Sequence, residues 1–321
     1  MDEVTRSWFM RHLPLFTFAL LAALAGTSCS TVPVAPAVWH GPESTGKITT
    51  PLLEEASGLA PSHLAPGVFW LHNDSGGQPV LYAVGADGRY RGAVRIAGAT
   101  NIDWEDAASF RLAGRSYLLA ADTGDNRAGR TDCVLYIIAE PNPADLNPDR
   151  ELTAAIAWQI PVSYPGGPRD CECVAVDAQE RSVYLISKRT TPPMVYRLPL
   201  LPEPGAPPPP AMVMGELDGI PQPSGPIALV DAPWGRARAM PCGFDLAPDH
   251  RTAVVLSYGE VYLYHRQPGA TWAQAFAGQA QQLPAHGLPQ AEAVCFTSDG
   301  KAVMVTTEGC PAPLLRYSSG H

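Results

Sequence analysis

The amino-acid sequence predicts an all-β protein, a five-bladed β-propeller. One phrase recurs along the 321 residues: a marker residue, a short apolar strand, a turn, a second apolar strand and a polar loop. The marker residues are Glu55, Glu105, Glu172, Cys242 and Glu292. Because a repeat longer than about forty residues with three clear strands is typical of propeller blades, each phrase is interpreted as one blade.

Strand composition indicates the same fold class. The repeated strands are short and rich in Val, Leu and Tyr, and no long stretch after the amino terminus has helical periodicity. A closed ring of sheets can take up this many residues as one domain, which we expect over residues 47–321. Six blades is the alternative, because the longer intervals after Glu105 and Glu172 leave room for further strands.

The blades are expected in chain order. The first covers about Glu55–Gly98, and the second ends near Ile160. The third contains the run Pro202–Pro210, which cannot join a central sheet and is therefore expected as a surface loop. The last blade has only three strands, so we expect residues 47–53 to supply its fourth strand and to close the ring.

Residues 1–28 are predicted to be a targeting segment rather than part of the fold. Basic residues precede the apolar run Leu13–Ala25, which is too short to span a bilayer comfortably. The following Gly26-Thr-Ser-Cys29 resembles the bacterial lipobox, in which the Cys is lipidated and becomes the mature amino terminus. We expect an exported lipoprotein of the bacterial cell envelope, held to the membrane only by its lipid, with residues 29–46 as a flexible tether. Secretion after cleavage near Ser28 is the alternative.

Six cysteines follow Cys29 in the sequence. An even number of cysteines in an oxidising compartment indicates disulfides. Cys133 and Cys171 are the leading predicted pair, because Cys133 should begin a strand near the start of the next blade. Other cysteines, such as Cys295 within a strand, are expected to fill the core.

The charge of the chain narrows the classes of partner. The net charge is −9 and the sequence has no Lys/Arg cluster, so a nucleic-acid partner is not expected. An acidic surface suits solubility and cation binding. We expect a monomer that takes a small-molecule or envelope ligand at the mouth of the propeller channel.

Acidic markers stand at equivalent positions of four phrases, and they form the main candidate site. The first strand of each propeller blade lines the central channel, so Glu55, Glu105, Glu172 and Glu292 should converge at one channel mouth. Carboxylates this close repel one another and raise one another's pKa values unless a cation lies among them. Oxygen ligands without His or thiolate favour calcium. The alternative is structural, with each Glu capping backbone amides or pairing with a Lys or Arg.

The loops after the second strands add polar groups on the same face. Asp122, Asp125 and Asn126 are candidates for a second calcium site, although Asp/Asn/Gly loops are also plain turns. Lys188 and Arg189 suit an anion such as phosphate, and equally suit neutralisation of the acidic ring.

Several motifs resemble those of a known group of proteins. They are Glu55-Ala-Ser-Gly-Leu-Ala60, Asp103-Trp-Glu-Asp106, Gly124-Asp-Asn-Arg127 and the segment Glu292–Gly300. Similar motifs occur in secreted bacterial propellers that are grouped loosely with the phytase-like propellers. The acidic ring is also similar to that of apyrase-type calcium-activated nucleotidases, which are five-bladed propellers with a central calcium held by one side chain per blade.

These resemblances imply the fold and a calcium site at the four Glu residues. Cys242 departs from the nucleotidase pattern, because a hydroxyl or carboxylate would be expected there. Calcium phytases have six blades and a denser basic cleft, which this sequence does not show. Activity is therefore a separate hypothesis from fold.

Three functions follow as hypotheses. The first is a calcium-binding propeller without an assignable substrate. The second is a calcium-dependent phosphohydrolase that uses metal-activated water as its nucleophile, with phosphate held by the basic residues of the rim loops. The third is a lactonase-like hydrolase, which the pair Asn73-Asp74 keeps open. The candidate catalytic residues are His72, Asp74, Lys188, Arg189 and Arg127.

Overall fold

The computed structural model describes residues 37–203, 205–230 and 235–320. The predicted leader 1–28 and the lipidation candidate Cys29 lie outside the described residues. Strands dominate the described part. Its one α-helix is the short α1 (Trp272–Phe276), and 3-10 turns form η1 (Pro143–Asp145), η2 (Gly225–Leu229) and η3 (Arg236–Ala239). No helix in these ranges is long and apolar enough to cross a membrane.

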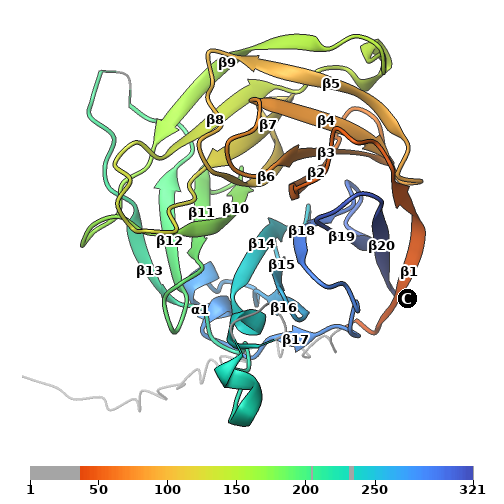
Figure 1. Ribbon diagram of the computed structural model, residues 1–321. Coiled ribbons are helices and arrows are strands. Elements are labelled where there is room, and N and C mark those ends of the chain that lie inside the picture. The colour runs from red at the N-terminus through yellow and green to blue at the C-terminus, as the bar shows by residue number, and fades with distance from the viewer. Residues whose placement is uncertain (1–36, 204, 231–234, 321) are drawn as a thin grey trace, which may run out of the picture. The chain divides into compact units, whose positions relative to one another are not determined.

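Strands that follow one another in the chain pair in antiparallel groups (Figure 1). The first group is β2 (Ala56–Pro61), β3 (Val68–Asn73), β4 (Val80–Gly85) and β5 (Tyr90–Ala97). The next is β6 (Trp104–Leu112), β7 (Arg115–Asp122), β8 (Val134–Ala139) and β9 (Leu152–Pro161). Then come β10 (Cys171–Asp177), β11 (Ser182–Ser187), β12 (Met194–Pro199) and β13 (Met212–Glu216).

The remaining groups complete the ring of sheets. One is β14 (Pro241–Leu246), β15 (Thr252–Ser257), β16 (Val261–His265) and β17 (Gln281–Gln282). The other is β18 (Ala291–Phe296), β19 (Ala302–Thr307), β20 (Ala312–Ser319) and β1 (Trp39–Ile48). In addition, β5 and β9 pair in parallel, so the first two groups form one eight-stranded sheet.

The closing strand β1 comes from the amino-terminal side of the domain, as predicted. It pairs antiparallel with β20 and becomes the outer strand of the sheet that contains β18. Its bounds differ from the prediction: β1 ends at Ile48 instead of reaching residue 53, and it begins at Trp39. Residues 39–46 therefore belong to the sheet, although a flexible tether was predicted there. Pairing along this whole length covers the edge of β20, which would otherwise expose unpaired backbone groups.

The inner strands identify the architecture as a β-propeller. β2, β6, β10, β14 and β18 lie side by side in this order, and β18 contacts β2, so they close on themselves. Each apolar core cluster combines two neighbouring groups. Leu119 of β7 and Val183 of β11 belong to one such cluster, and Met304 of β19 and Phe69 of β3 belong to the cluster that closes the ring. The predicted all-β propeller class is confirmed.

A buried carboxylate, that of Asp106, ties three inner strands together on the channel axis. Its oxygens accept the backbone N–H groups of Ala107 at 2.8 Å, Val174 at 2.8 Å and Phe244 at 3.2 Å. Inner strands have no neighbour on the channel side, so their N–H groups need a partner from elsewhere. Asp106 supplies it, and its side chain is fully buried.

The predicted Cys133–Cys171 disulfide is wrong, because all six described cysteines are free thiols. Cys133 and Cys171 are both buried in the same apolar core cluster, where they pack as small apolar side chains. Burial raises the pKa of Cys133 to about 11, which keeps the thiol protonated. Cys295 is buried within β18, so its predicted place in the core is confirmed.

Candidate cation site at the channel mouth

The end of the channel at which the inner strands begin, here called the channel mouth, is built by β-bulges. One residue is skipped in the pairing of each of β6, β10, β14 and β18 with the following strand. The skipped residues are Glu105, Glu172, Cys242 and Glu292. A bulged residue is left out of the ladder, which re-aims its side chain. The predicted markers of these strands therefore share one structural cause.

Glu55 does not belong to this set, although the sequence repeat predicted it. Ala56 pairs with Asn73, the last residue of β3, just as Trp104 pairs with Asp122, the last residue of β7. Glu55 is therefore equivalent to Asp103, one residue before the strand. The bulge of β2 instead falls at Gly58, and Glu55 is exposed. The prediction that four Glu residues surround one point is thus corrected by the strand register.

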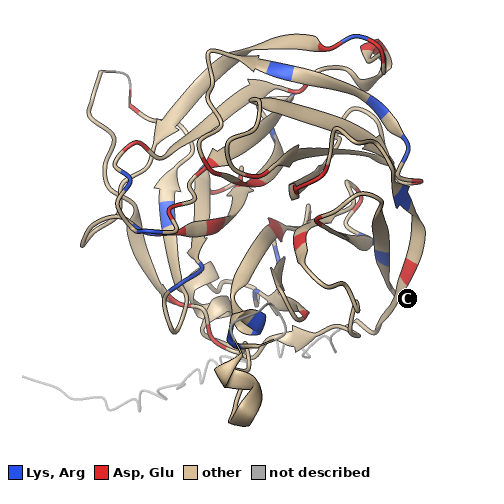
Figure 2. Cartoon of the chain, in the orientation of Figure 1, with Lys and Arg blue, Asp and Glu red and all other residues tan. Residues whose placement is uncertain are grey.

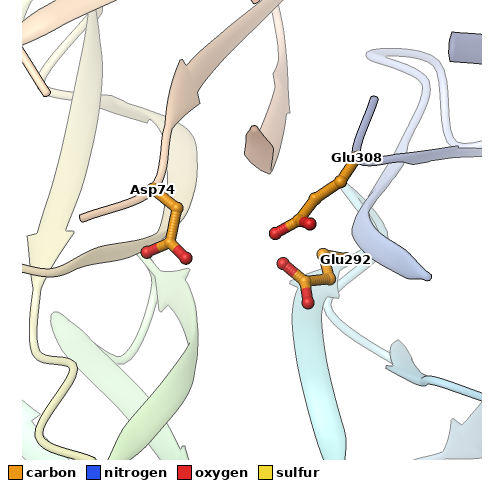
Figure 3. A group of neighbouring side chains, drawn as sticks. All are labelled: Asp74, Glu292 and Glu308. Atoms are coloured by element: carbon orange, nitrogen blue, oxygen red, sulfur yellow. The ribbon is translucent and has the colours of Figure 1, made fainter. Parts of the chain in front are cut away.

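Three overlapping groups of carboxylates form at the mouth instead. Within each group the carboxylate oxygens lie within 4.8 Å of one another. The groups are Asp74, Asp103 and Glu105; Glu105, Asp170 and Glu172; and Asp74, Glu292 and Glu308. Figure 3 shows the last group, with Glu292 and Glu308 close together and Asp74 facing them. In Figure 2, acidic segments gather on the inner strands and their loops around the centre of the ring.

Sequence reasoning did not assign Asp103, Asp170 and Glu308 as cation ligands of the site. A signal for Glu308 was present: it stands one residue after β19, as Asp74 does after β3 and Lys188 after β11. Asp103 and Asp170 each stand one residue before an inner strand. Aligning the repeats by strand ends, rather than by their acidic markers, would have found all three.

The carboxylate of Glu105 is buried and lacks a partner among the described residues. Its side chain is only 5% exposed, and its carboxylate has no hydrogen bond or ion pair with any described residue. Gly124 makes room for it, because a Cβ atom there would lie 2.0 Å from Glu105 Oε1 and 2.5 Å from Asp103 Oδ2. A buried ionised group without a partner is costly, so this carboxylate needs a proton or a cation.

Lys188 is the buried cation of the mouth. Its Nζ donates to the carboxylate of Glu172 and, at 2.9 Å, to the hydroxyl of Tyr258. Burial alone would lower the pKa of Lys188, but Glu172 and the other surrounding groups raise it, so the ammonium stays charged. Tyr258 also brings its ring beneath the ammonium, with 5.0 Å between Nζ and the ring centroid.

Arg189 is held in the same way as Lys188. Its Nε donates to Asp170 Oδ2 at 2.6 Å, and its Nη2 donates to Asn126 Oδ1. Arg127, a further predicted phosphate ligand, is exposed on the loop. The two basic residues nearest the mouth are therefore engaged by acidic residues rather than open to an anion.

Crowding and burial raise the pKa values of the mouth carboxylates. Burial, followed by the nearby Glu292 and Asp103, raises the pKa of Asp74 to about 6. Burial and a hydrogen bond with Glu292 raise the pKa of Glu308 to about 9. Burial and Glu172 raise the pKa of Glu105 well above its ordinary value. Without a cation, Glu308 is therefore protonated at neutral pH.

The contacts around Asp122, Asp125 and Asn126 favour a turn over the predicted second calcium site. Asp122 pairs with Arg130 at 2.8 Å and accepts the backbone N–H of Asp103 at 3.1 Å. Asp125 accepts the backbone N–H groups of Gly129 and Arg130, at 2.9 and 2.8 Å. The carboxylate oxygens of Asp122 and Asp125 already accept these hydrogen bonds, and the Arg130 guanidinium would repel a cation.

His72, a predicted base at the mouth, lies inside the protein instead. It is fully buried, and its ring stands edge-on to Trp104 with 5.4 Å between ring centroids. Burial lowers the pKa of His72 to about 4, so the imidazole is neutral. Its Nδ1 lies 3.0 Å from the carbonyl oxygen of Asn73. His72 therefore has no route to a ligand at the mouth.

The β14 group contributes no carboxylate to the mouth. Cys242 occupies its bulge, and the buried thiol donates to the carbonyl oxygen of Ala291 at 3.1 Å. Tyr258, one residue after β15, provides the polar group instead. The mouth is thus acidic over most of its circumference and carries the Lys188–Tyr258 pair on the remaining side.

Comparison with known proteins adds little beyond this geometry. No protein-family model and no curated protein matches the sequence. The WD40 domain of Neurospora crassa Pan2 is similar in structure, with 9% identity and a TM-score of 0.34 over 85% of this chain and 65% of that chain. The chain thus spans slightly less than two thirds of the Pan2 structure's length.

Two further solved structures are similar at the same level. A luciferin-regenerating enzyme shares 9% identity and a TM-score of 0.41, over 88% of this chain and 96% of that chain. A chain of a nidogen–laminin complex shares 13% identity and a TM-score of 0.40, over 78% and 72%. Similarity this remote carries no information about activity.

Proposed function

We propose that this protein is a five-bladed propeller that binds a calcium ion at its channel mouth, with Asp74, Asp103 and Glu105 as protein ligands. Each four-stranded group is then one blade, and β1 completes the last. The observation that carries the calcium proposal is the unpartnered, buried carboxylate of Glu105, which belongs to two of the three carboxylate groups.

The donor set fits calcium. Every candidate ligand at the mouth is a carboxylate, and hard oxygen donors favour calcium over zinc or copper. Two oxygens on opposite sides of a calcium, each at about 2.4 Å, lie about 4.8 Å apart. The oxygens of Asp74, Asp103 and Glu105 are within that limit of one another. Calcium takes six to eight oxygens, so water or a bound ligand would complete the shell.

Calorimetric titration of metal-free protein with calcium tests the proposal. We expect Glu105→Gln to weaken calcium binding by at least about tenfold, because it removes the charge at the centre of the site while keeping its shape. Glu216→Gln is the matched control, since Glu216 is exposed at the end of the outer strand β13. Equal affinity of the Glu105 variant and the control would rule the site out.

Two hydrolases are the alternative functions: a calcium-dependent phosphohydrolase, which the resemblance to phytase-like and apyrase-type propellers implies, and a lactonase-like hydrolase, which the pair Asn73-Asp74 keeps open. Phosphate would have to compete with Glu172 for Lys188 and with Asp170 for Arg189. The side chain of Asn73, a lactonase candidate, already bonds to the backbone of Glu55 and Leu52. Cation binding is therefore the function that the contacts favour. Turnover of a phosphate ester or lactone that chelation abolishes would establish a hydrolase instead.

Export and lipid anchoring at Cys29 are also proposed, from the sequence of residues 1–29 alone. We expect the wild-type protein in the membrane fraction of a bacterial host and the Cys29→Ser variant outside it. Wild-type protein in the cytoplasmic fraction would contradict this part of the proposal.

A further inference from the structure

A cavity lies at the end of the channel opposite the mouth, where the inner strands end. Its volume is about 240 Å³. It is lined by residues from the ends of all the inner strands, among them Pro61, Ser109, Val176, Asp245 and Phe296. None of the residues that line it belongs to the carboxylate groups of the mouth, so the two sites are separate. An engineered apolar cavity of about 150 Å³ holds benzene, so this space admits a small organic molecule.

The one carboxylate in the wall of this cavity has no counter-ion. Asp245 is 8% exposed and accepts only the backbone N–H groups of Leu246 at 2.8 Å and Phe296 at 2.9 Å. It forms no ion pair with a described residue. Burial raises the pKa of Asp245 to about 7, as expected for a carboxylate that lacks a cation. Two carboxylate oxygens offer about four acceptor positions, so it can accept further hydrogen bonds.

The surrounding wall is partly apolar and partly unpaired. Phe110, Leu246 and Phe296 supply apolar surface. The buried Ser109 Oγ and His63 Nε2 have no hydrogen-bond partner among the described residues. Burial lowers the pKa of His63, so its imidazole is neutral and does not act as the missing cation. Arg111 lies at the cavity but is exposed, where water screens its charge.

We propose that this cavity binds a small protonated amine with an apolar body, with its ammonium group against Asp245. The ammonium supplies the absent counter-ion and donates to the carboxylate, and Ser109 accepts or donates one further bond. The apolar body packs against Phe110 and Phe296. A metal ion is disfavoured, because Asp245 belongs to none of the clusters of metal-ligating side chains among the described residues.

Titration with benzylamine and with benzyl alcohol, followed by NMR, tests the proposal. The two probes have nearly the same shape, and only benzylamine carries a positive charge. At about pH 8, with calcium present to occupy the mouth, we expect benzylamine to bind at least about tenfold more tightly than benzyl alcohol. Equal binding of the two probes, or no binding of either at millimolar concentration, would overturn it.

Variants of single residues test at which site the probe binds. Asp245→Asn should remove the preference for the amine, while it keeps one acceptor oxygen for the backbone. Ser109→Leu should block both probes by filling the cavity. Glu216→Gln, on the outer strand β13, should change neither. Benzylamine binding that calcium or Glu105→Gln abolishes would place the amine at the mouth and contradict the proposal. The comparison of the two probes on wild-type protein holds even if Asp245→Asn fails to fold.

Discussion

Glu105 and Asp106 are consecutive residues of β6, but their buried carboxylates lie in two regions that differ in the hydrogen bonds they provide. Asp106, on the channel axis, accepts three backbone N–H groups from three inner strands. Glu105, at the mouth, has no partner among the described residues. Both side chains are at least nine-tenths buried. Burial alone therefore does not reveal a role: Asp106 is satisfied by the backbone of three strands and holds the fold, whereas Glu105 is left unsatisfied by the described residues and is free to hold a ligand.

The β-bulge explains how neighbours come to differ so much. Asp106 pairs with Ala121 and remains in the ladder, so its side chain points toward the axis between inner strands. Glu105 is skipped by the ladder and its side chain turns to the mouth. Repeating this bulge in β10 and β18 gathers the carboxylates of Glu172 and Glu292 at the same end.

The largest effect on stability is expected from Asp106→Ala. Three buried backbone N–H groups would lose their acceptor, at about 1–3 kcal/mol each. We expect the free energy of unfolding to fall by about 3 kcal/mol or more, measured by denaturant titration. Asp106→Asn keeps one acceptor oxygen and should lose less. Unchanged stability of the alanine variant would contradict the structural role of this carboxylate.

The next largest effect on the free energy of unfolding is expected from calcium binding at the mouth. At a hundred times its dissociation constant, a ligand that binds only the folded state adds about 2.7 kcal/mol. Chelation should lower the melting temperature of the wild-type protein, and calcium should restore it where sodium at equal ionic strength does not. Glu105→Gln should cut this calcium response to about half or less, as a site at least about tenfold weaker requires. Asp149→Asn, at an exposed loop residue, should keep it.

In the metal-free protein, stability should fall as the pH rises from about 7 to 9.5. A carboxylate whose pKa is raised on folding contributes stability that is present at low pH and lost as the pH passes through the raised value. Glu308, with a pKa of about 9, and Glu172, raised by burial to about 8, titrate in this window. The buried His72 is already neutral there and adds no slope.

Thermal melts across this pH range, with chelator or with saturating calcium, measure the effect. Calcium should flatten the dependence, because it stabilises the ionised carboxylates. Glu308→Gln should reduce the slope in chelator, and Glu216→Gln should not. A metal-free protein that becomes more stable toward high pH would show that the mouth carboxylates do not control this range.

Glu55→Gln is expected to have the smallest effect, a change in calcium affinity. The strand register makes Glu55 equivalent to Asp103, but its side chain is exposed and belongs to none of the carboxylate groups. We expect its calcium affinity to remain within about twofold of wild type, because charges screened by water interact weakly. A loss as large as that of Glu105→Gln would restore the four-Glu ring that the sequence repeat predicted.

The sequence by itself determined the fold class, the order of the strands and the three Glu residues at the bulges of the mouth. Glu105, Glu172 and Glu292 were found because each precedes the same local pattern of apolar residues, and such patterns depend only on neighbours along the chain. The closing role of the amino-terminal strand followed from a count of strands, although its bounds, Trp39–Ile48, did not. The free thiols of Cys133 and Cys171 were not foreseen, because their packing depends on the neighbouring blade.

Only the tertiary structure decided which carboxylates meet. A register shift of one residue moves a side chain to another face, so Glu55 drops out of the carboxylate groups while Asp103 and Glu308 join them. The exclusion of His72 and the isolation of Asp245 have the same origin. Both depend on contacts between strands far apart in sequence, which no local pattern records.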